Sequence, residues 1–188
     1  MNRPVVAKVG GSLFDLPDLR DRLRYWLHRL EAESVVIVPG GGPSADAFRR
    51  LHHTHGLTQE TSHGLAIRAM SVNGHFLASL LDVPVIATLE NAGAISVLDA
   101  YEFCSADQGR AGELEHTWRV TSDAIAARVA AGGGHLHILK STHLPIGVNW
   151  ADAAQAGLVD GAFGEVVAAG GVVVTWVNLR DPKYAMRI

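Results

Sequence analysis

Short apolar runs alternate along the chain with segments in which apolar residues recur at helical spacing. Continuous runs of this length are typical of strands that are buried on both faces of a sheet. Strands that alternate with helices assemble into parallel sheets, because each helix returns the chain to the same edge. The pattern therefore predicts an α/β fold with a mainly parallel central sheet. The predicted strands lie at residues 4–9, 34–38, 84–88, 95–99, 135–139 and 172–177.

The helical segments have recognisable starts and stops. Asp15 is placed to cap the first helix, which carries a stripe of leucines, and Pro43 is placed in the first turn of the second. Residues 104–116 combine mixed charge with two glycines, which predicts an exposed loop. The remaining helices are predicted at about 59–81, directly after Thr121-Ser122-Asp123, from about Asn149 to Gly157, and at about 161–169.

Composition narrows the class of protein. The 188 residues predict a single domain, 1–188, and a chain with 48% hydrophobic and 19% charged residues is typically globular. A formal net charge of -3 without a basic block argues against a nucleic-acid partner, and no apolar stretch is long enough to cross a membrane. Cys104 is the only cysteine, and no signal peptide precedes the first strand. We therefore expect a cytoplasmic protein without an internal disulfide.

Two predicted strands end in glycine-rich turns that open helices. Glycine leaves backbone N–H groups unshielded, and a helix N-terminus adds free donors with a partial positive charge. Each turn is therefore a candidate phosphate site, and two such sites in one domain suggest a phosphoryl donor and acceptor held face to face. The first turn holds Gly10, Gly11 and Ser12 shortly after Lys8, and the second holds Gly40, Gly41 and Gly42 before Pro43 and Ser44.

Neither turn fits two common nucleotide motifs. The chain has no Walker sequence, and the triple glycine lacks the spacing of the dinucleotide fingerprint. A P-loop kinase and a Rossmann dehydrogenase are therefore disfavoured. Lys8 by itself is compatible with a surface lysine at a strand end, but the adjoining glycine pair favours a cation that neutralises a transferring phosphoryl group.

Other polar residues have both a structural and a functional interpretation. Asp123 is consistent with an ordinary first-turn acid of a helix, or with a carboxylate that orients lysines. Lys140 follows a strand and precedes Ser141 and Thr142, so it is equally a surface lysine or a second phosphate cation. Of His63 and Arg68, at most one is expected to contact an anionic acceptor, because a spacing of five puts them on different helix faces.

The ten histidines raise the question of a metal site. His52 and His55 are one helical turn apart, and His135 and His137 share a strand face. Zinc sites need three or four ligands with supporting acids, and no such set is evident in the sequence. We therefore predict no metal-ligating residues, and a metal-storage function is the weakest of our hypotheses.

Three of these features occur in the order seen in the amino acid kinase superfamily, which the chain resembles from residue 4 to about 140. They are Lys8-Val9-Gly10-Gly11-Ser12, the triple-glycine turn and the helix start at Thr121-Ser122-Asp123. Residues 62–70 and 115–123 look most like the furan phosphate kinases of methanofuran biosynthesis, which use ATP and magnesium. The resemblance implies a three-layer αβα sandwich and, in this superfamily, a homodimer or larger homo-oligomer.

The resemblance also implies roles for individual residues. Lys8 would stabilise the transferring phosphoryl group, and Asp123 would organise the lysines. Lys140 is a candidate for a further catalytic cation from its place at a strand end, where it would replace a lysine that relatives carry later in the chain. Residues on the ATP side would be Gly10, Gly11, Ser12, Thr121, Ser122, Ser141 and Thr142. Residues on the acceptor side would be Gly40, Gly41 and Gly42, with either His63 or Arg68 as a further candidate.

The C-terminal part departs from the family pattern. ATP-using relatives usually carry Asp-Val-Asp-Gly after the strand at 135–139, whereas this chain has Lys140-Ser141-Thr142-His143. A later glycine-rich segment with a lysine is also missing, so the nucleotide-binding part is shortened. We expect a kinase that transfers the γ-phosphoryl group of ATP, with Mg²⁺, to a small anionic acceptor such as a phosphate monoester. The alternative is a non-catalytic subunit that binds a phosphate metabolite.

Overall fold

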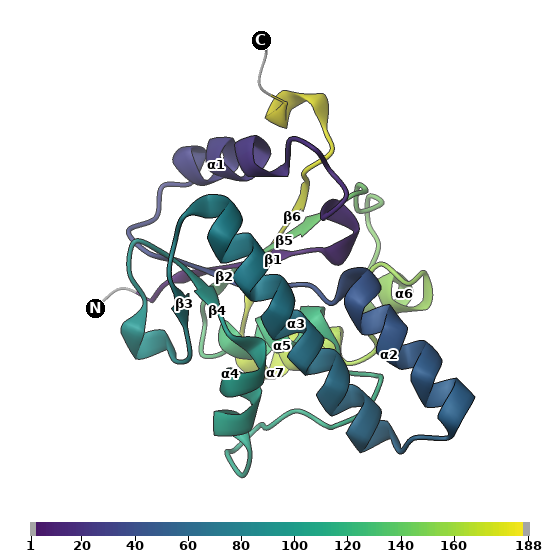
Figure 1. Cartoon of the computed structure of the whole chain (residues 1–188). Coiled ribbons are helices and arrows are strands. Elements are labelled where there is room, and N and C mark those ends of the chain that lie inside the picture. Colours follow the sequence, from purple (N-terminus) through teal and green to yellow (C-terminus); the bar gives the residue numbers. More distant parts are fainter. Residues whose placement is uncertain (1–2, 186–188) are drawn as a thin grey trace.

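The central sheet consists of six parallel strands in the order β3-β4-β2-β1-β5-β6 (Figure 1). This computed structural model describes residues 3–185, so the ends of the predicted domain 1–188 lie outside it. The strands are β1 (Val5–Val9), β2 (Val35–Pro39), β3 (Val85–Ile86), β4 (Ile95–Leu98), β5 (His135–Lys140) and β6 (Val173–Asn178). The predicted parallel α/β architecture is confirmed.

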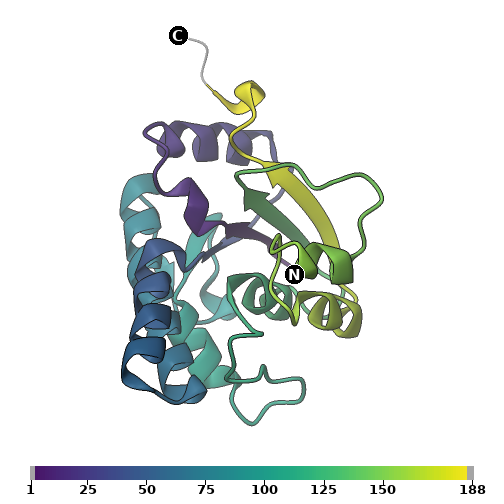
Figure 2. The ribbon, with the colours of Figure 1, turned by 90° about the vertical axis from the view of Figure 1, so that its right-hand side faces the viewer.

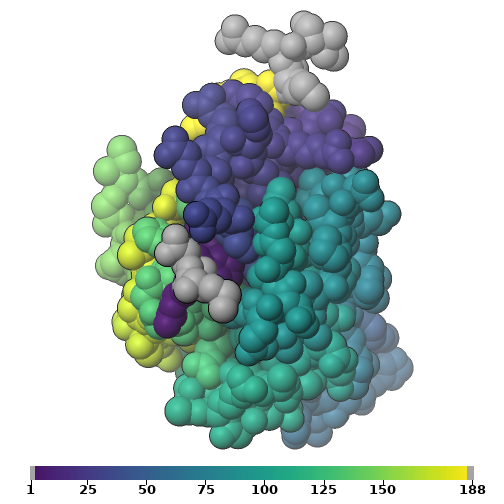
Figure 3. All heavy atoms as spheres, turned by 90° about the vertical axis from the view of Figure 1, so that its left-hand side faces the viewer, coloured from purple at the N-terminus to yellow at the C-terminus, as the bar shows by residue number. Residues whose placement is uncertain are grey.

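Helices cover both faces of the sheet, as Figure 2 shows with α1 above the strands and α5 and α7 below them. On one face, α1 packs beside the C-terminal end of α3, where Arg24 donates to the Leu81 carbonyl at 3.2 Å (Figure 3). The α-helices are α1 (Leu19–Arg29), α2 (Gly42–His55), α3 (Gln59–Leu81), α4 (Ala100–Asp107), α5 (Ser122–Val129), α6 (Trp150–Gln155) and α7 (Phe163–Gly170). Short 3-10 turns are η1 (Gly11–Leu13), η2 (Leu89–Asn91) and η3 (Pro182–Tyr184).

Alternation along the strands divides the core into two clusters. Val6, Val36 and Ile138 point to the face covered by α5 and α7, and Ala7 and Ile37 point to the face covered by α1. Side chains that alternate in this way let one strand contribute to both layers of the sandwich. No helix within residues 3–185 is long and apolar enough to span a bilayer.

Three local predictions differ from the structure. Helix α1 begins after Asp18, and Asp15 does not cap it because its carboxylate pairs with Arg180. Strand β3 has two residues rather than five. The segment expected as a loop from 104 begins inside α4, whose N-cap Asp99 accepts from the N–H groups of Tyr101 and Glu102.

Candidate active site

The two glycine turns follow β1 and β2. They meet at the carboxyl edge of the sheet because these two strands are parallel neighbours. A Cβ atom on Gly11 would lie 2.3 Å from the Cα of Gly42, and one on Gly40 would lie 2.4 Å from the Gly11 nitrogen. Gly42 also has a φ of +52°, a conformation that side chains disfavour. These glycines are therefore required by the close approach of one turn to the other.

Four backbone N–H groups in the two turns have no acceptor among the described residues; they belong to Gly11, Ser12, Gly41 and Gly42. The N–H of Gly10 instead donates to the Leu139 carbonyl at 2.9 Å, and that of Gly40 donates to the Val9 carbonyl at 2.8 Å. Unpaired amides of this kind suit an anion, because phosphate oxygens supply the missing acceptors.

Asn73 of α3 holds the second turn in place. Its buried amide nitrogen donates to the carbonyls of Gly40 at 2.8 Å and Gly41 at 2.7 Å. Its amide oxygen accepts a hydrogen bond of 3.2 Å from the hydroxyl of Ser44 in the first turn of α2. Asn73 thus fixes the turn through its carbonyls and leaves the N–H groups of Gly41 and Gly42 for a ligand. Nothing in the local sequence indicates this role of Asn73.

A buried cluster of three charges lies beside the amides. Asp123 Oδ1 is 2.9 Å from Lys8 Nζ, and Asp123 Oδ2 accepts a hydrogen bond of 2.9 Å from Lys140 Nζ. The Lys8 contact is an ion pair that lacks hydrogen-bond geometry. The side chains of Lys8 and Asp123 are 4% and 5% exposed, and that of Lys140 is 16% exposed. Three elements supply the cluster, which carries one net positive charge when both lysines are protonated.

Burial and neighbouring charges set the protonation of this cluster. Burial tends to raise the pKa of Asp123, but the two ammonium groups outweigh it and hold that pKa below its usual value. Burial, with a further contribution from the charge of Lys8, lowers the pKa of Lys140 to about 8 in spite of Asp123. Asp123 is therefore ionised at neutral pH, and Lys140 loses its proton at a lower pH than a free lysine does.

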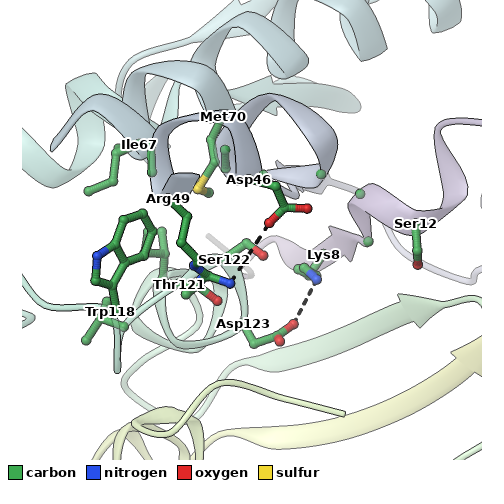
Figure 4. A pocket seen from close by; sticks show the side chains of 18 of the residues that line it. Lys8, Ser12, Asp46, Arg49, Ile67, Met70, Trp118, Thr121, Ser122 and Asp123 are labelled. Atoms are coloured by element: carbon green, nitrogen blue, oxygen red, sulfur yellow. Dashed lines mark ion pairs between the residues drawn. The ribbon is translucent and has the colours of Figure 1, made fainter. Parts of the chain in front are cut away.

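The cluster and the amides line one side of a cavity of about 350 Å³ (Figure 4). The opposite side is formed by Arg49 of α2, by Ile67 and Met70 of α3, and by the indole of Trp118. The Arg49 guanidinium lies 4.6 Å from the centroid of the Trp118 ring and 3.9 Å from Asp46. Sequence reasoning missed Arg49 and Trp118, because nothing in the local sequence indicates that the loop bearing Trp118 faces α2.

The structure brings together most of the predicted site residues. The cavity is lined by Lys8, Gly10, Gly11, Ser12, Gly41, Gly42, His63, Thr121, Ser122, Asp123 and Lys140.

Four predicted residues lie outside the cavity lining: Gly40, Arg68, Ser141 and Thr142. Arg68 is exposed and donates to the hydroxyl of Tyr101 at 2.6 Å, above whose ring its guanidinium lies. Ser141 still reaches the rim of the site, since its hydroxyl lies 3.1 Å from that of Ser12. Arg68 and Thr142 have no contact with the charged cluster.

His63 is a buried residue of the cavity wall. A carbonyl can only accept, so the 2.9 Å contact with the Val120 oxygen places a proton on Nε2. Burial lowers the pKa of His63, against the opposing effect of this hydrogen bond. The ring is therefore neutral near pH 7, and His63 contributes no positive charge to the site.

The residues present fit the phosphate groups of a nucleotide better than they fit an isolated metal ion. Free amides and two lysines match phosphate oxygens. Among residues 3–185, no three His, Cys, Asp or Glu side chains are grouped as metal ligands. Mg²⁺ is commonly held largely by the phosphates of its nucleotide and by water, so this arrangement suits an ion that arrives with its nucleotide.

Comparisons with known proteins bear on the family and the fold. Residues 3–132, more than half of the chain, match the sequence pattern of the amino acid kinase family. A (5-(aminomethyl)furan-3-yl)methyl phosphate kinase of Methanocaldococcus jannaschii is 28% identical over 129 residues, which cover 64% of this chain. The match spans 57% of that relative. The crystal structure of uridylate kinase from Archaeoglobus fulgidus shares the fold with a TM-score of 0.62 and 14% identity, covering 93% of this chain and 90% of that one.

Proposed function

The chain belongs to the amino acid kinase family, and from that premise we propose that it transfers the γ-phosphoryl group of ATP to a small phosphate monoester. The observation that carries the proposal is the Lys8–Asp123–Lys140 cluster beside four unpaired amides. Phosphoryl transfer needs positioning and charge stabilisation far more than covalent chemistry, and this site supplies both.

Each part of the site has a role in this reaction. The amides of Gly11 and Ser12 bind the phosphates of the donor, and those of Gly41 and Gly42 bind the phosphate of the acceptor. Lys8 and Lys140 neutralise the charge that develops between them, and bound Mg²⁺ supplies further neutralisation of the donor phosphates. An acceptor phosphate oxygen attacks the γ-phosphorus while the bond to the ADP oxygen breaks.

The far wall of the cavity suggests how the acceptor is selected. Trp118, Ile67 and Met70 form an apolar surface for the body of a small ester, and Arg49 adds a cation at its edge. We assign to Arg49 the role expected from sequence for Arg68, which lies outside the cavity. The furan ester named for the Methanocaldococcus relative is one acceptor of this class.

A non-catalytic binding function is the alternative. It is favoured by the segment after β5, because Ser141 and Thr142 do not line the cavity and the sequence lacks the usual nucleotide segment. The lone cysteine favours a reducing, cytoplasmic setting for either function. Assembly into a homodimer, as in the superfamily, is part of the proposal.

One experiment separates the two functions. ADP release is measured with Mg-ATP and a panel of phosphate monoesters and carboxylates, with Lys8→Ala as the control. Thermal shifts are recorded with Mg-ATP, Mg-ADP and the same esters. The kinase proposal expects ester-dependent ADP release that is lost in Lys8→Ala. Stabilisation by esters alone, with no response to nucleotide and no ADP, would establish the binding function instead.

A further inference from the structure

Asp160 lies between α6 and α7, outside residues 3–132, yet its carboxylate reaches back to the start of α5. Its Oδ2 accepts three hydrogen bonds: from the Thr121 N–H at 2.9 Å, the Thr121 hydroxyl at 3.0 Å and the Ala124 N–H at 2.9 Å. Thr121 is the N-cap residue of α5, but its side chain accepts no capping hydrogen bond. The cap of α5 therefore comes from a residue 36 to 39 positions further along the chain.

The anchored amides lie on either side of Asp123. Because residues 121 and 124 are both held by Asp160, the first turn of α5 has little freedom to move the carboxylate that pairs with Lys8 and Lys140. An acid at a helix N-terminus also interacts favourably with the helix dipole. No cation pairs with Asp160 in the described part of the chain, so this cap does not compete with Asp123 for a lysine.

The segment that carries Asp160 is itself firmly held. The N–H of Ala162 donates to the Arg119 carbonyl at 2.9 Å, just before the start of α5. Phe163 is fully buried and packs edge-on against Trp150, with ring centroids 4.9 Å apart. Asp160 is thus held in place by α6 and α7, and its hydrogen bonds hold the first turn of α5 in turn.

We propose that Asp160 is a positioning residue for phosphoryl transfer, which holds Asp123 where it bridges the two site lysines. The expected effect on turnover rests on the proposed kinase function, whereas the positioning of Asp123 by Asp160 does not. It gives the C-terminal third a role in the phosphate site, although that third lacks the nucleotide segment usual in relatives.

The chain offers a matched control for the loss of a helix cap. Asp99 caps α4, and its Oδ1 also accepts three hydrogen bonds: from the Ser71 hydroxyl at 2.6 Å and from the N–H groups of Tyr101 at 2.9 Å and Glu102 at 3.1 Å. Asp99 does not line the cavity. Asp160→Ala and Asp99→Ala therefore each remove a carboxylate that caps a helix and accepts three hydrogen bonds, one beside the site and one away from it.

The test measures the surroundings of the lysine side chains directly, by NMR. The sequence contains only Lys8, Lys140 and Lys183, so protein labelled with ¹³C at lysine Cε gives three resonances, with exposed Lys183 as the internal reference. We expect Asp160→Ala to move the Lys8 and Lys140 resonances, whereas Asp99→Ala leaves them in place. Turnover with ATP should fall by about 10–100-fold in Asp160→Ala with little change in KM for ATP, because only the reacting geometry is disturbed.

A second variant keeps the test decisive if Asp160→Ala does not fold. Asp160→Asn retains one acceptor oxygen, so it should move the same resonances by a smaller amount and recover most of the turnover. Native resonances in folded Asp160→Ala, or equal effects on turnover from Asp99→Ala, would overturn the positioning role. So would native resonances and native turnover in Asp160→Asn if the alanine variant cannot be studied. Absence of kinase activity in the wild type leaves the resonance test intact.

Discussion

Replacing Asp123 by asparagine tests whether the charged cluster behaves as described. Asp123→Asn keeps the size of the side chain but leaves two buried lysines without their shared counter-ion. Breaking a buried ion pair from one side typically destabilises a protein by about 3–5 kcal/mol. The full loss is avoided here, because Lys140 can give up its proton. In the wild type, where the pKa of Lys140 is about 8, removing that proton takes about 1.4 kcal/mol at pH 7, which limits the loss that passes through Lys140.

The destabilisation should therefore depend on pH. Asp123 attracts the proton of Lys140, so the stability it contributes through Lys140 is present below pH 8 and is lost as pH rises through the pKa of about 8. At pH 9 the wild-type lysine is already largely neutral, and only the Lys8 pair remains to be broken. We expect Asp123→Asn to lower the free energy of unfolding by about 3 kcal/mol at pH 7 and by about 1 kcal/mol less at pH 9.

Urea denaturation at the two pH values measures this difference, and a second buried pair provides the control. Asp107 accepts hydrogen bonds of 2.9 and 2.8 Å from Arg128, away from the site. A guanidinium keeps its proton at both pH values, so Asp107→Asn should destabilise the protein equally at pH 7 and pH 9. An Asp123→Asn variant with the same loss at both pH values, or with no loss at pH 7, would refute the description of the cluster.

Three further predictions concern catalysis. Lys8→Ala should lower turnover by about 100–1000-fold while circular dichroism shows a folded protein, and Lys183→Ala should leave turnover unchanged. The alkaline limb of kcat/KM should fall near the pKa of about 8 of Lys140, and Lys140→Arg should move it to higher pH because a guanidinium stays protonated. Arg49→Ala should raise KM for the acceptor about tenfold, and Arg68→Ala should not; the reverse order would return the acceptor role to Arg68.

The sheet could be predicted from sequence because its signals are local. Most strands are short, mainly apolar runs, and α3 has the bounds that its capping Thr58 and apolar periodicity indicate. Helix α4 was missed because glycines and charges further along suggested a loop. The sequence nevertheless marks the start of α4, since Asp99 precedes Glu102 by three residues in the manner of a capping box. Asp15 could not be assigned in this way, because its partner Arg180 is 165 positions away.

The site, too, could be predicted from sequence only where its signals are local. The glycines of the two turns are visible in sequence, because each follows an apolar run and opens a helix. The second wall of the cavity was not visible, since Trp118 meets Arg49 only through the packing of a loop against α2. The role of Asp123 was equally hidden from local reasoning, in which a first-turn acid needs no function. The resemblance to the kinase superfamily is what pointed to a role for Asp123. The structure gives the physical reason, because Asp123 pairs with two lysines from separate strands.

The arrangement of charge argues for turnover rather than storage. Asp123 is buried and forms ion pairs with both lysines before any ligand is present, so the ammonium groups are oriented in advance. A binding protein gains affinity from cations that contact the ground state, and flexible surface lysines would serve it. Fixed, desolvated cations stabilise charge that develops at one point between two phosphate sites, because they need no reorganisation as it forms. Asn73 fixes the turn of Gly40 and Gly41 beside that cluster, and Asp160 holds the first turn of α5, which carries Asp123.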